Sequence, residues 1–336
     1  MIHRIKDFKT SSVVRRVPAE DLTDIEPRKK RPERGDVIVC TVNRVGWHQE
    51  LENRFGRYLR LFEGDNVVVA IGNRYATREF EGKIPEDLKH GLDLLNSGGV
   101  CGRMIGKNLF VADPTRLTFA GYVIKNGEVV NIKDFAEEEK KTYKTVPIIL
   151  VVGSGMDAGK TTTAATIVKS LATRGHIVCA GKLTGTARSK DILLMQDAGA
   201  KTVLDHVDAG FPSTYKCRRE QLLKIFKIIY SNLASAAPDF IVLEIADGVF
   251  QRETNILLEE KVLMAKVAHI FFSASDSLSA YGSYLYLEKM GLEIRAFSGP
   301  VANSKLTVRE VLEKTGVPCI APIKRDVGEI YSMITG

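Results

Sequence analysis

A glycine-rich stretch, GSGMDAGKTTT, follows directly on the apolar run VPIILVV and occupies residues 153–163. An apolar strand, a glycine-containing turn and a Lys-Thr pair that opens a helix are the arrangement that phosphate binding requires. Backbone N–H groups and the positive end of the helix face the phosphate, and glycine lets the backbone approach it closely. The sequence therefore predicts a phosphate-binding loop, followed by a helix from Lys160 to about Thr173.

The spacing of the two glycines in this loop is unusual. The common pattern G-x-x-x-x-G-K-[ST] would put its first glycine at position 154, where Ser154 stands, and the glycine is Gly153 instead. Within the loop, Lys160 is expected to reach the β- and γ-phosphates, and the Thr161 hydroxyl is expected to hold Mg²⁺. The predicted nucleotide-binding residues of the loop are Gly153, Gly155, Ala158, Gly159, Lys160, Thr161 and Thr162.

The loop resembles, position for position, the G-T-D-T-E-V-G-K-T loop of dethiobiotin synthetase. Both have five residues between the glycines and an acid two places before the second one, here Asp157, for which the resemblance implies a catalytic role. The wider group includes the cobyrinic-acid amidating enzymes and the MinD/ParA-type ATPases. Because Gly155 stands where the partitioning ATPases carry a signature lysine, the chain resembles the metabolic enzymes more closely.

A second segment, AGKLTGTA at residues 180–187, resembles the K-P-x-x-T/S-G segment that ends the second strand of dethiobiotin synthetase. Lys182 falls on the lysine that contacts the carboxylate-bearing substrate and the transferring phosphate in that family. The resemblance therefore implies an electrostatic, catalytic role for Lys182 and makes Thr184 a candidate substrate residue. Leu183 replaces the proline of the family pattern, and the spacing is about two residues shorter.

The apolar run FIVLEIADG contains the acids of a predicted metal site. A carboxylate at the end of a buried strand beside a phosphate-binding loop is the usual partner of Mg²⁺. Glu244 takes that place, and Asp247 is an alternative ligand. A charge within such an apolar run would be costly without a partner, which favours a metal-side role for Glu244.

Two further segments supply candidates for the base and for the substrate. IRAFSGPVANSKLT resembles a strand that ends in an adenine-contacting asparagine, here Asn303, and the guanine-reading N-K-x-D motif is absent, so ATP is expected. LDHVDAGFPSTYKCRRE, residues 204–220, lies where substrate-facing residues enter dethiobiotin synthetase-like folds. Its candidate substrate residues are His206, Lys216, Arg218 and Arg219. Alternatively, His206 is a loop histidine whose hydrogen bonds are all made within the fold. The three basic residues could likewise be solvated side chains at the start of a helix.

Two patterns of apolar residues predict the fold class, α/β. From Val146 onward, continuous apolar runs alternate with helical segments, which predicts a three-layer, mainly parallel sheet. Earlier runs are short and β-branched, and Asn126-Gly127 predicts a hairpin, so a smaller β-rich barrel or sandwich precedes it. PEDLKHGLDLLNSGG, residues 85–99, is predicted to be a helix. The predicted divisions are an irregular segment 1–34, a β-rich domain 35–133, a linker 134–146 and a P-loop domain 147–336.

Composition constrains the partners of this chain. A formal charge of +7 and a pI near 9.0 favour anionic ligands. The basic block RKKRPER, residues 28–34, is interpreted as a solvated linker because no aromatic residues interleave with it, so nucleic acid is not an expected partner. No apolar run approaches the ~18 residues of a membrane span, and no secretory signal is seen. A cytoplasmic location is expected, and the resemblance implies a homodimer.

Four functions are compatible with these features, and one of them, a polynucleotide kinase, is suggested by the positive charge alone. The first is an ATP- and Mg²⁺-dependent enzyme that transfers a phosphoryl group to a small anionic metabolite or activates it as a ligase does. The second is a coenzyme A-dependent N-acyltransferase on a P-loop fold, because the chain also resembles, more distantly, the family that includes D-glutamate N-acetyltransferase. The third is a non-enzymatic nucleotide switch or assembly factor whose β-rich domain binds a partner.

Overall fold

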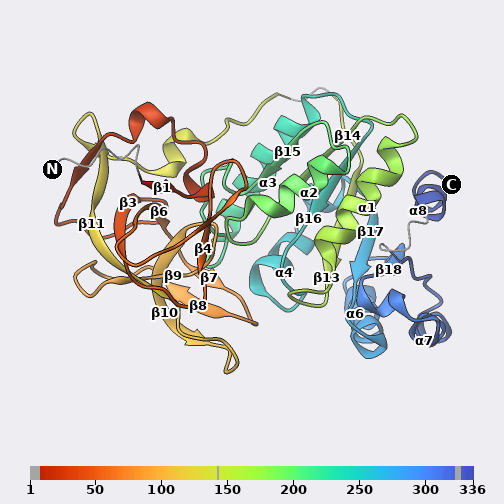
Figure 1. Ribbon diagram of the computed structural model, residues 1–336. Helices are drawn as coiled ribbons and strands as arrows, with labels where there is room; N and C mark the ends of the chain where they lie inside the picture. The colour runs from red at the N-terminus through yellow and green to blue at the C-terminus, as the bar shows by residue number, and fades with distance from the viewer. Residues whose placement is uncertain (1–7, 142–143, 322–326) are drawn as a thin grey trace. The chain divides into compact units, whose positions relative to one another are not determined.

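The computed structural model describes residues 8–141, 144–321 and 327–336, whose course is drawn in Figure 1. The chain forms two compact units. The first unit contains Met1–Glu137, Thr186–Lys190 and His206–Lys216. The second contains Glu138–Gly185, Asp191–Asp205 and Cys217–Gly336.

The second unit is built on a six-stranded parallel sheet of order β15-β14-β16-β13-β17-β18. Its strands are β13 (Ile148–Gly153), β14 (Val178–Lys182), β15 (Val203–Asp205), β16 (Phe240–Glu244), β17 (Val267–Ser273) and β18 (Ala296–Ser298). All residues of the central strand β13 are buried, because helices cover both faces of a parallel sheet. The continuous apolar runs of the sequence are these strands.

Helices α1 and α3 lie on opposite faces of this sheet. Ile167 and Leu171 of α1 pack in one core cluster with Ile149 of β13. On the other face, a Cβ added to Gly181 of β14 would meet Ile229 and Leu233 of α3. The helices are α1 (Lys160–Ala172), α2 (Ser189–Asp197), α3 (Arg219–Ala234), α4 (Arg252–Leu258), α5 (Lys261–Met264), α6 (Ser277–Lys289), α7 (Lys305–Thr315) and α8 (Val327–Thr335). The predicted three-layer α/β fold is confirmed, as is the helix that begins at Lys160.

The first unit contains a closed five-stranded β-barrel. Its strands pair in the cycle β3–β6–β10–β9–β11–β3, so every barrel strand has two neighbours. Closure removes the exposed sheet edges that would otherwise pair with other chains. The barrel strands are β3 (Val37–Arg44), β6 (Asn66–Ile71), β9 (Leu92–Leu94), β10 (Val100–Lys107) and β11 (Thr115–Lys125).

Shorter elements extend or flank the barrel. The additional strands are β1 (Lys9–Thr10), β2 (Asp24–Glu26), β4 (Glu50–Glu52), β5 (Tyr58–Arg60), β7 (Arg74–Tyr75), β8 (Phe80–Lys83) and β12 (Glu128–Val129). The 3₁₀ turns of the chain are η2 (Ser12–Val14), η3 (Ala19–Asp21), η4 (Ile132–Phe135) and η5 (Pro300–Asn303). The β11–β12 hairpin turns at Asn126 and Gly127, with φ of 53° and 81°. Two positive φ angles are the signature of the tight turn that Asn-Gly favours, so the predicted hairpin is confirmed.

The helix predicted over residues 85–99 is wrong. This segment contains β9, which pairs with β10 on one side and β11 on the other. Leu92 and Leu94, two residues apart, both enter the barrel core, which a helical turn would not allow. Gly91 and Gly99, both with positive φ, lie on either side of the part that contains β9. Pairing with two distant strands outweighed the local helical pattern.

The N-terminal segment is more ordered than the sequence suggested. In the described part of residues 1–34, β1 pairs with β6 and β2 pairs with β11. Val13, Val14 and Val17 are fully buried in a core cluster, so few apolar residues suffice to attach this segment to the barrel. Of the predicted linker, η4 takes up the beginning, and residues 142 and 143 lie outside the described residues.

Two segments that the sequence placed in the P-loop domain belong to the first unit. Glu52 of β4 is buried and accepts hydrogen bonds from the backbone N–H groups of Ser189 and Lys190, at 2.7 and 2.8 Å. Asp208 forms an ion pair of 2.7 Å with Arg15. Buried charges of the first unit therefore hold residues 186–190 and 206–216. No local sequence signal shows that these two segments belong to the first unit.

A buried charge cluster in the first unit predicts its response to acid. Burial raises the pKa of the Glu79 carboxyl, but the His48 hydrogen bond and the Arg74 charge outweigh burial and lower it to about 2. Such a carboxylate stabilises the fold above its unfolded pKa, near 4.5, and this contribution is lost as the pH falls toward 2. Burial also lowers the pKa of His48. Below about pH 6.5 this histidine therefore binds a proton more readily in the unfolded protein than in the folded one, which destabilises the fold further.

Glu79→Gln is therefore expected to lower the free energy of unfolding at pH 7 by about 1–2 kcal/mol, less than the pKa shift alone would give because the carboxylate is partly exposed to solvent. The difference from the parent protein should shrink between pH 4.5 and 2, where Glu79 gains its proton. Urea unfolding at pH 7, 4 and 3 measures both effects, with Glu63→Gln as a control at an exposed position. A difference that stayed constant with pH would contradict the assignment.

Within the described residues, no helix combines the length and the apolar character that a membrane span requires.

Candidate functional site

The glycine-rich loop joins β13 to α1. A Cβ at Gly153 would lie 2.8 Å from the carbonyl oxygen of Ser273, so the neighbouring strand admits only glycine here. Gly159 has φ of 90°, a left-handed conformation that glycine adopts without strain, and Asp157 has φ of 61°. A Cβ at Gly155 would meet nothing within 4 Å. The loop is therefore sterically constrained at its two ends, whereas the space beside Gly155 is open.

Lys160, the first residue of α1, curls back over the loop. Its buried Nζ donates a hydrogen bond of 2.6 Å to the carbonyl oxygen of Gly155. Burial lowers the pKa of Lys160, and the carboxylates of Glu244, Asp247 and Asp157 act in the opposite direction. The ammonium thus lies beside the N-terminus of α1. A bound anion there would replace the Gly155 carbonyl oxygen as its hydrogen-bond partner.

Three hydroxyls anchor the start of α1 to the sheet. Thr163 Oγ1 donates to or accepts from Ser298 Oγ at 2.8 Å and Ser273 Oγ at 3.1 Å, and it lies 3.0 Å from the Gly159 carbonyl oxygen. All three hydroxyl residues are fully buried. Sequence reasoning missed Ser273 and Ser298 because single serines at strand ends carry no motif; only the parallel register of β17 and β18 brings them to the loop.

Glu244 lies at the end of β16, next to the loop, as predicted. The Thr161 hydroxyl donates to Glu244 Oε1 at 3.2 Å. The other oxygen of this carboxylate, Oε2, is buried and has no hydrogen-bond partner among the residues that the structure describes. A buried carboxylate oxygen without a partner is costly, and a hydroxyl beside a carboxylate is the protein share of a typical Mg²⁺ site. The residues therefore fit a magnesium ion that takes its remaining ligands from phosphate and water.

Lys182, at the end of β14, joins the same cluster. Its ammonium forms an ion pair with Asp191 and lies 3.4 Å from Glu244 Oε1. Burial lowers the pKa of Lys182, but Asp191 and Glu244 outweigh it, so the pKa is raised and the lysine stays charged. Sequence reasoning missed Asp191, whose signal is an acid in the first turn of α2, nine residues after Lys182.

Asp247 and Thr184 lie on the loops that follow β16 and β14. Asp247 has φ of 64°, unusual for a residue with a side chain, and its charge acts on both Lys160 and Lys182. The buried Thr184 hydroxyl accepts a hydrogen bond of 2.9 Å from the N–H of Ala246. Thr184 therefore links the two loops, and its contact with substrate stays a prediction.

The turn that carries Asn303 packs against the phosphate-binding loop. A Cβ at Gly299 would lie 2.2 Å from the carbonyl oxygen of Ala158, and Gly299 has a positive φ of 86°. Asn303 ends η5, four residues further along, and is exposed. The structure thus brings the Asn303 turn beside the loop and leaves its side chain accessible.

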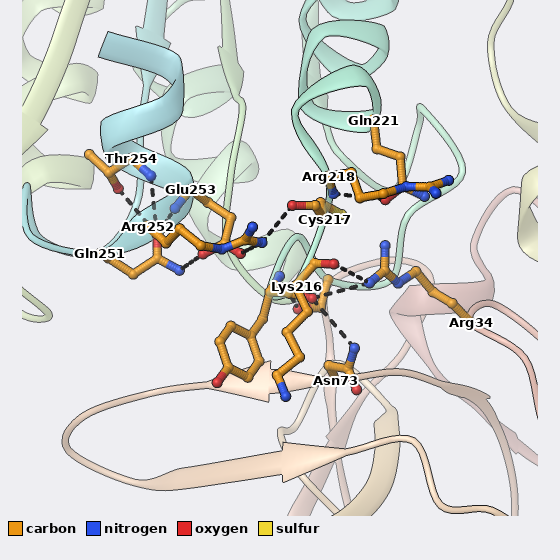
Figure 2. Close-up of polar contacts among 12 residues, drawn as sticks. Arg34, Asn73, Lys216, Cys217, Arg218, Gln221, Gln251, Arg252, Glu253 and Thr254 are labelled. Carbon is orange, nitrogen blue, oxygen red and sulfur yellow. Dashed lines mark hydrogen bonds and ion pairs between the residues drawn. The ribbon is translucent and has the colours of Figure 1, made fainter. Parts of the chain in front are cut away.

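The four candidates from residues 204–220 divide between the units. His206 and Lys216 belong to the first unit. His206 is buried and its Nδ1 donates to the carbonyl oxygen of Phe211 at 2.8 Å, as in the satisfied-histidine interpretation. Lys216 lies with its Nζ 5.4 Å from the centre of the Tyr215 ring. Figure 2 shows Arg34 donating to the carbonyl oxygen of Lys216, at 3.2 Å.

Arg218 and Arg219 begin α3 in the second unit. The backbone N–H of Arg218 donates to Gln221 at 2.9 Å, a capping contact that Figure 2 also shows. The Arg219 guanidinium contacts both oxygens of the buried Glu260 carboxylate, one of them at 2.7 Å. Arg219 is therefore engaged in an ion pair within the fold. These contacts agree with the helix-start interpretation of this segment.

Comparison with known proteins returns weak structural matches. No protein-family model matches the chain, and no curated protein does. The signal recognition particle 54 kDa protein of Aeropyrum pernix K1, in complex with GDP, is 17% identical with a TM-score of 0.38. The alignment covers 57% of this chain and 49% of that one, so it spans about half of the Aeropyrum protein.

A second match is the signal recognition particle receptor FtsY of Elizabethkingia anophelis. Its complex with GDP is 16% identical, with a TM-score of 0.40 and coverage of 60% of this chain and 67% of that one. The other FtsY structure from that organism has a TM-score of 0.39 at 16% identity, with coverage of 58% and 68%. With TM-scores this low, neither similarity supports a conclusion about function.

The site itself identifies the class of protein. One cluster contains a buried parallel strand, a glycine-rich turn, and a lysine and a threonine that open a helix. An acid at the end of β16, the strand beside β13 in the sheet, completes the cluster. This is the arrangement of a P-loop nucleotide-binding fold.

Proposed function

We propose that the chain is an ATP- and Mg²⁺-dependent enzyme that transfers the γ-phosphoryl group to a small anionic metabolite or activates it for ligation. The observation that carries this proposal is a second lysine, Lys182, whose side chain is only 11% exposed. Lys182 contacts the same carboxylate, Glu244, that contacts the P-loop threonine. A phosphate-binding loop needs one lysine to hold a nucleotide, and a second one beside it suits the charge that moves during transfer.

The proposed roles follow from the positions of the charges. Lys160 exchanges its contact with the Gly155 carbonyl for the β- and γ-phosphates. Thr161 and Glu244 would hold Mg²⁺, with Asp247 as a further acid near the cluster. When bound, the ion neutralises phosphate charge during transfer.

Lys182 acts electrostatically in this proposal. Because its pKa is raised, it remains an ammonium ion at neutral pH and does not serve as a base. A bound γ-phosphate would compete with Asp191 for the ammonium, which can then stabilise the charge on the transferred group. The same ammonium can attract the carboxylate of an acceptor, as the resemblance to dethiobiotin synthetase implies.

The proposal extends to the base, to Asp157 and to the assembly of the protein. The exposed Asn303, on a turn packed against the loop, favours adenine as the base. Asp157 acts on the charge of Lys160, which supports an auxiliary role in phosphate binding. The resemblance is the basis for proposing a homodimer, and a cytoplasmic location is proposed from the sequence.

A nucleotide-dependent switch is the second candidate, and one observation favours it. The segments that follow β14 and β15, residues 186–190 and 206–216, are part of the first unit. A change at the ends of these strands would be transmitted to that unit through the chain itself. In that case, nucleotide turnover would respond to a protein partner instead of a metabolite.

An assay of ADP release distinguishes these candidates. With Mg²⁺ and ATP, small mono- and dicarboxylic acids offered with amines should raise ADP release at least ten-fold above the basal rate. Asn303→Ala should raise KM for ATP about ten-fold, consistent with loss of one or two hydrogen bonds to the base, and leave any activity with GTP unchanged. Thiol release from acetyl-coenzyme A without nucleotide turnover would contradict the proposal in favour of the acyltransferase, and basal turnover that responds only to a protein would favour the switch.

A further inference from the structure

The first unit has a cavity of about 1180 Å³ that the nucleotide site does not use. Four parts of the chain that lie far apart in the sequence form its walls: residues 27–31, Asn43 of β3, residues 86–91, and residues 116–119 with Tyr122 of β11. This volume exceeds the range of about 300–1,000 Å³ that is usual for small-molecule pockets. The cavity therefore has room for a ligand larger than one metabolite.

The walls of this cavity are strongly basic. Its cationic residues are Arg28, Lys29, Lys30, Arg31, Lys89 and Arg116, against two acids, Glu86 and Asp87. Arg28, Lys30 and Arg116 have carboxylate partners outside the cavity, at 2.9, 3.1 and 2.7 Å.

Three of the cations are available to a ligand. Lys29, Arg31 and Lys89 are exposed, and their side chains have no hydrogen-bond or ion-pair partner among the described residues. They come from two different walls. A ligand with several separated negative charges fits this arrangement.

Aromatic side chains from β11 lie in the same cavity. Phe119 and Tyr122 pack edge to face, with ring centres 5.1 Å apart, and Phe119 is partly exposed. The buried Tyr122 donates from its hydroxyl to the carbonyl oxygen of Lys30, at 3.3 Å. This bond holds the basic segment 27–31 against the barrel. The sequence suggested a solvated linker because it shows no aromatic residue near the block; the fold supplies the aromatic residues from a strand about 90 residues away.

We propose that this cavity binds single-stranded nucleic acid. Lys29, Arg31 and Lys89 contact successive phosphates, and a base stacks on the exposed part of Phe119. A basic groove combined with an aromatic platform is the combination that binds single strands without sequence preference. A flexible strand can also place its phosphates beside the cations and away from Glu86 and Asp87, which a compact polyphosphate cannot do as readily.

Fluorescence anisotropy with a labelled oligouridylate of about 12 nucleotides tests the proposal, since known single-strand binding sites on small β-barrels cover about 4–16 nucleotides. Three phosphate contacts predict a slope of about −2 in a plot of log K against log salt concentration. The affinity should accordingly fall roughly 20-fold between 50 and 200 mM salt. Binding that is absent or insensitive to salt would overturn the proposal.

Two sets of charge reversals distinguish binding at this cavity from binding due to the overall charge of the protein. The first variant carries Lys29→Glu, Arg31→Glu and Lys89→Glu. The matched control carries Lys224→Glu, Lys227→Glu and Lys305→Glu, all at exposed positions of the second unit. Each set lowers the formal charge by six, from +7 to +1. The first variant should weaken binding at least 20-fold and flatten the salt slope, and the control should change it less than three-fold; equal losses would contradict the proposed site.

Two further measurements keep the test decisive if the first variant is poorly folded. Phe119→Ala should weaken binding about ten-fold and leave the salt slope unchanged, because it removes stacking and no phosphate contact. Lys160→Ala should not affect oligonucleotide binding, so failure here is distinguishable from failure of the proposed ATP site. Displacement of the oligonucleotide by stoichiometric tripolyphosphate would instead indicate a small polyanion as the ligand and overturn the proposal.

Discussion

Lys160→Ala is expected to abolish ATP-dependent turnover, with kcat/KM lowered roughly 100- to 1,000-fold. The reason is the loss of a buried ammonium at the phosphate position, and one such preorganised donor contributes about 2.7–4 kcal/mol to transition-state stabilisation. Mg-ATP should also no longer raise the melting temperature, because stabilisation by a ligand disappears with its binding. ADP release and thermal unfolding, with and without Mg-ATP, measure the two effects.

The control for this prediction lies on the same helix. Lys169 of α1 is exposed, and Lys169→Ala removes the same charge without touching the loop. It should keep turnover within two-fold of the parent. The Lys160→Ala protein without nucleotide should be about as stable as the parent, because burial already disfavours this charge, as its lowered pKa indicates. Turnover retained within ten-fold would show that the loop lysine does not contact the reacting phosphate.

Lys182→Met is expected to have the largest effect on stability, about 3 kcal/mol. It leaves Asp191 and Glu244 as neighbouring carboxylates without their shared cation, and breaking a buried ion pair from one side is strongly destabilising. Urea unfolding at pH 7 measures this loss. Lys227→Met, at an exposed position of α3, is the matched control and should change the free energy of unfolding by less than about 0.5 kcal/mol.

A double substitution tests whether the charges act as one network. Lys182→Met combined with Asp191→Leu removes the ion pair from both sides, so it should be more stable than Lys182→Met alone. Turnover should remain low in the double variant, because its stability recovers but the second lysine of the site is still missing. Strictly additive losses of stability would contradict a coupled network, and recovery of turnover would contradict the proposed electrostatic role of Lys182.

The order of motifs along the chain predicted most of the nucleotide site. The loop itself, Thr161 and Glu244 lie together because β13 and β16 are neighbouring parallel strands, whose carboxyl ends lie at one edge of the sheet. The same logic did not reveal Asp191 or Ser298, which have no motif of their own. Their roles depend on which strand lies next to which, and on register.

The β-rich unit was less predictable, because its contacts are between distant parts of the sequence. Leu92 and Leu94 read locally as part of a helix, yet the barrel uses them as a strand between two others. Val13, Val14 and Val17 looked too few to form a core, but they complete one that other strands supply. Local propensity is a small energy beside burial in a shared core.

The sequence by itself determined the phosphate-binding loop and the parallel sheet that supports it. Both are local: a strand, a turn and a helix in immediate succession carry their own hydrophobic period and glycine positions. Only the tertiary structure decided that residues 186–190 and 206–216 belong to the first unit, and that a basic segment meets aromatic side chains of β11. These arrangements rest on buried pairs such as Glu52 with Ser189 and Asp208 with Arg15. Their partners are so far apart in sequence that no periodicity or motif records the pairing.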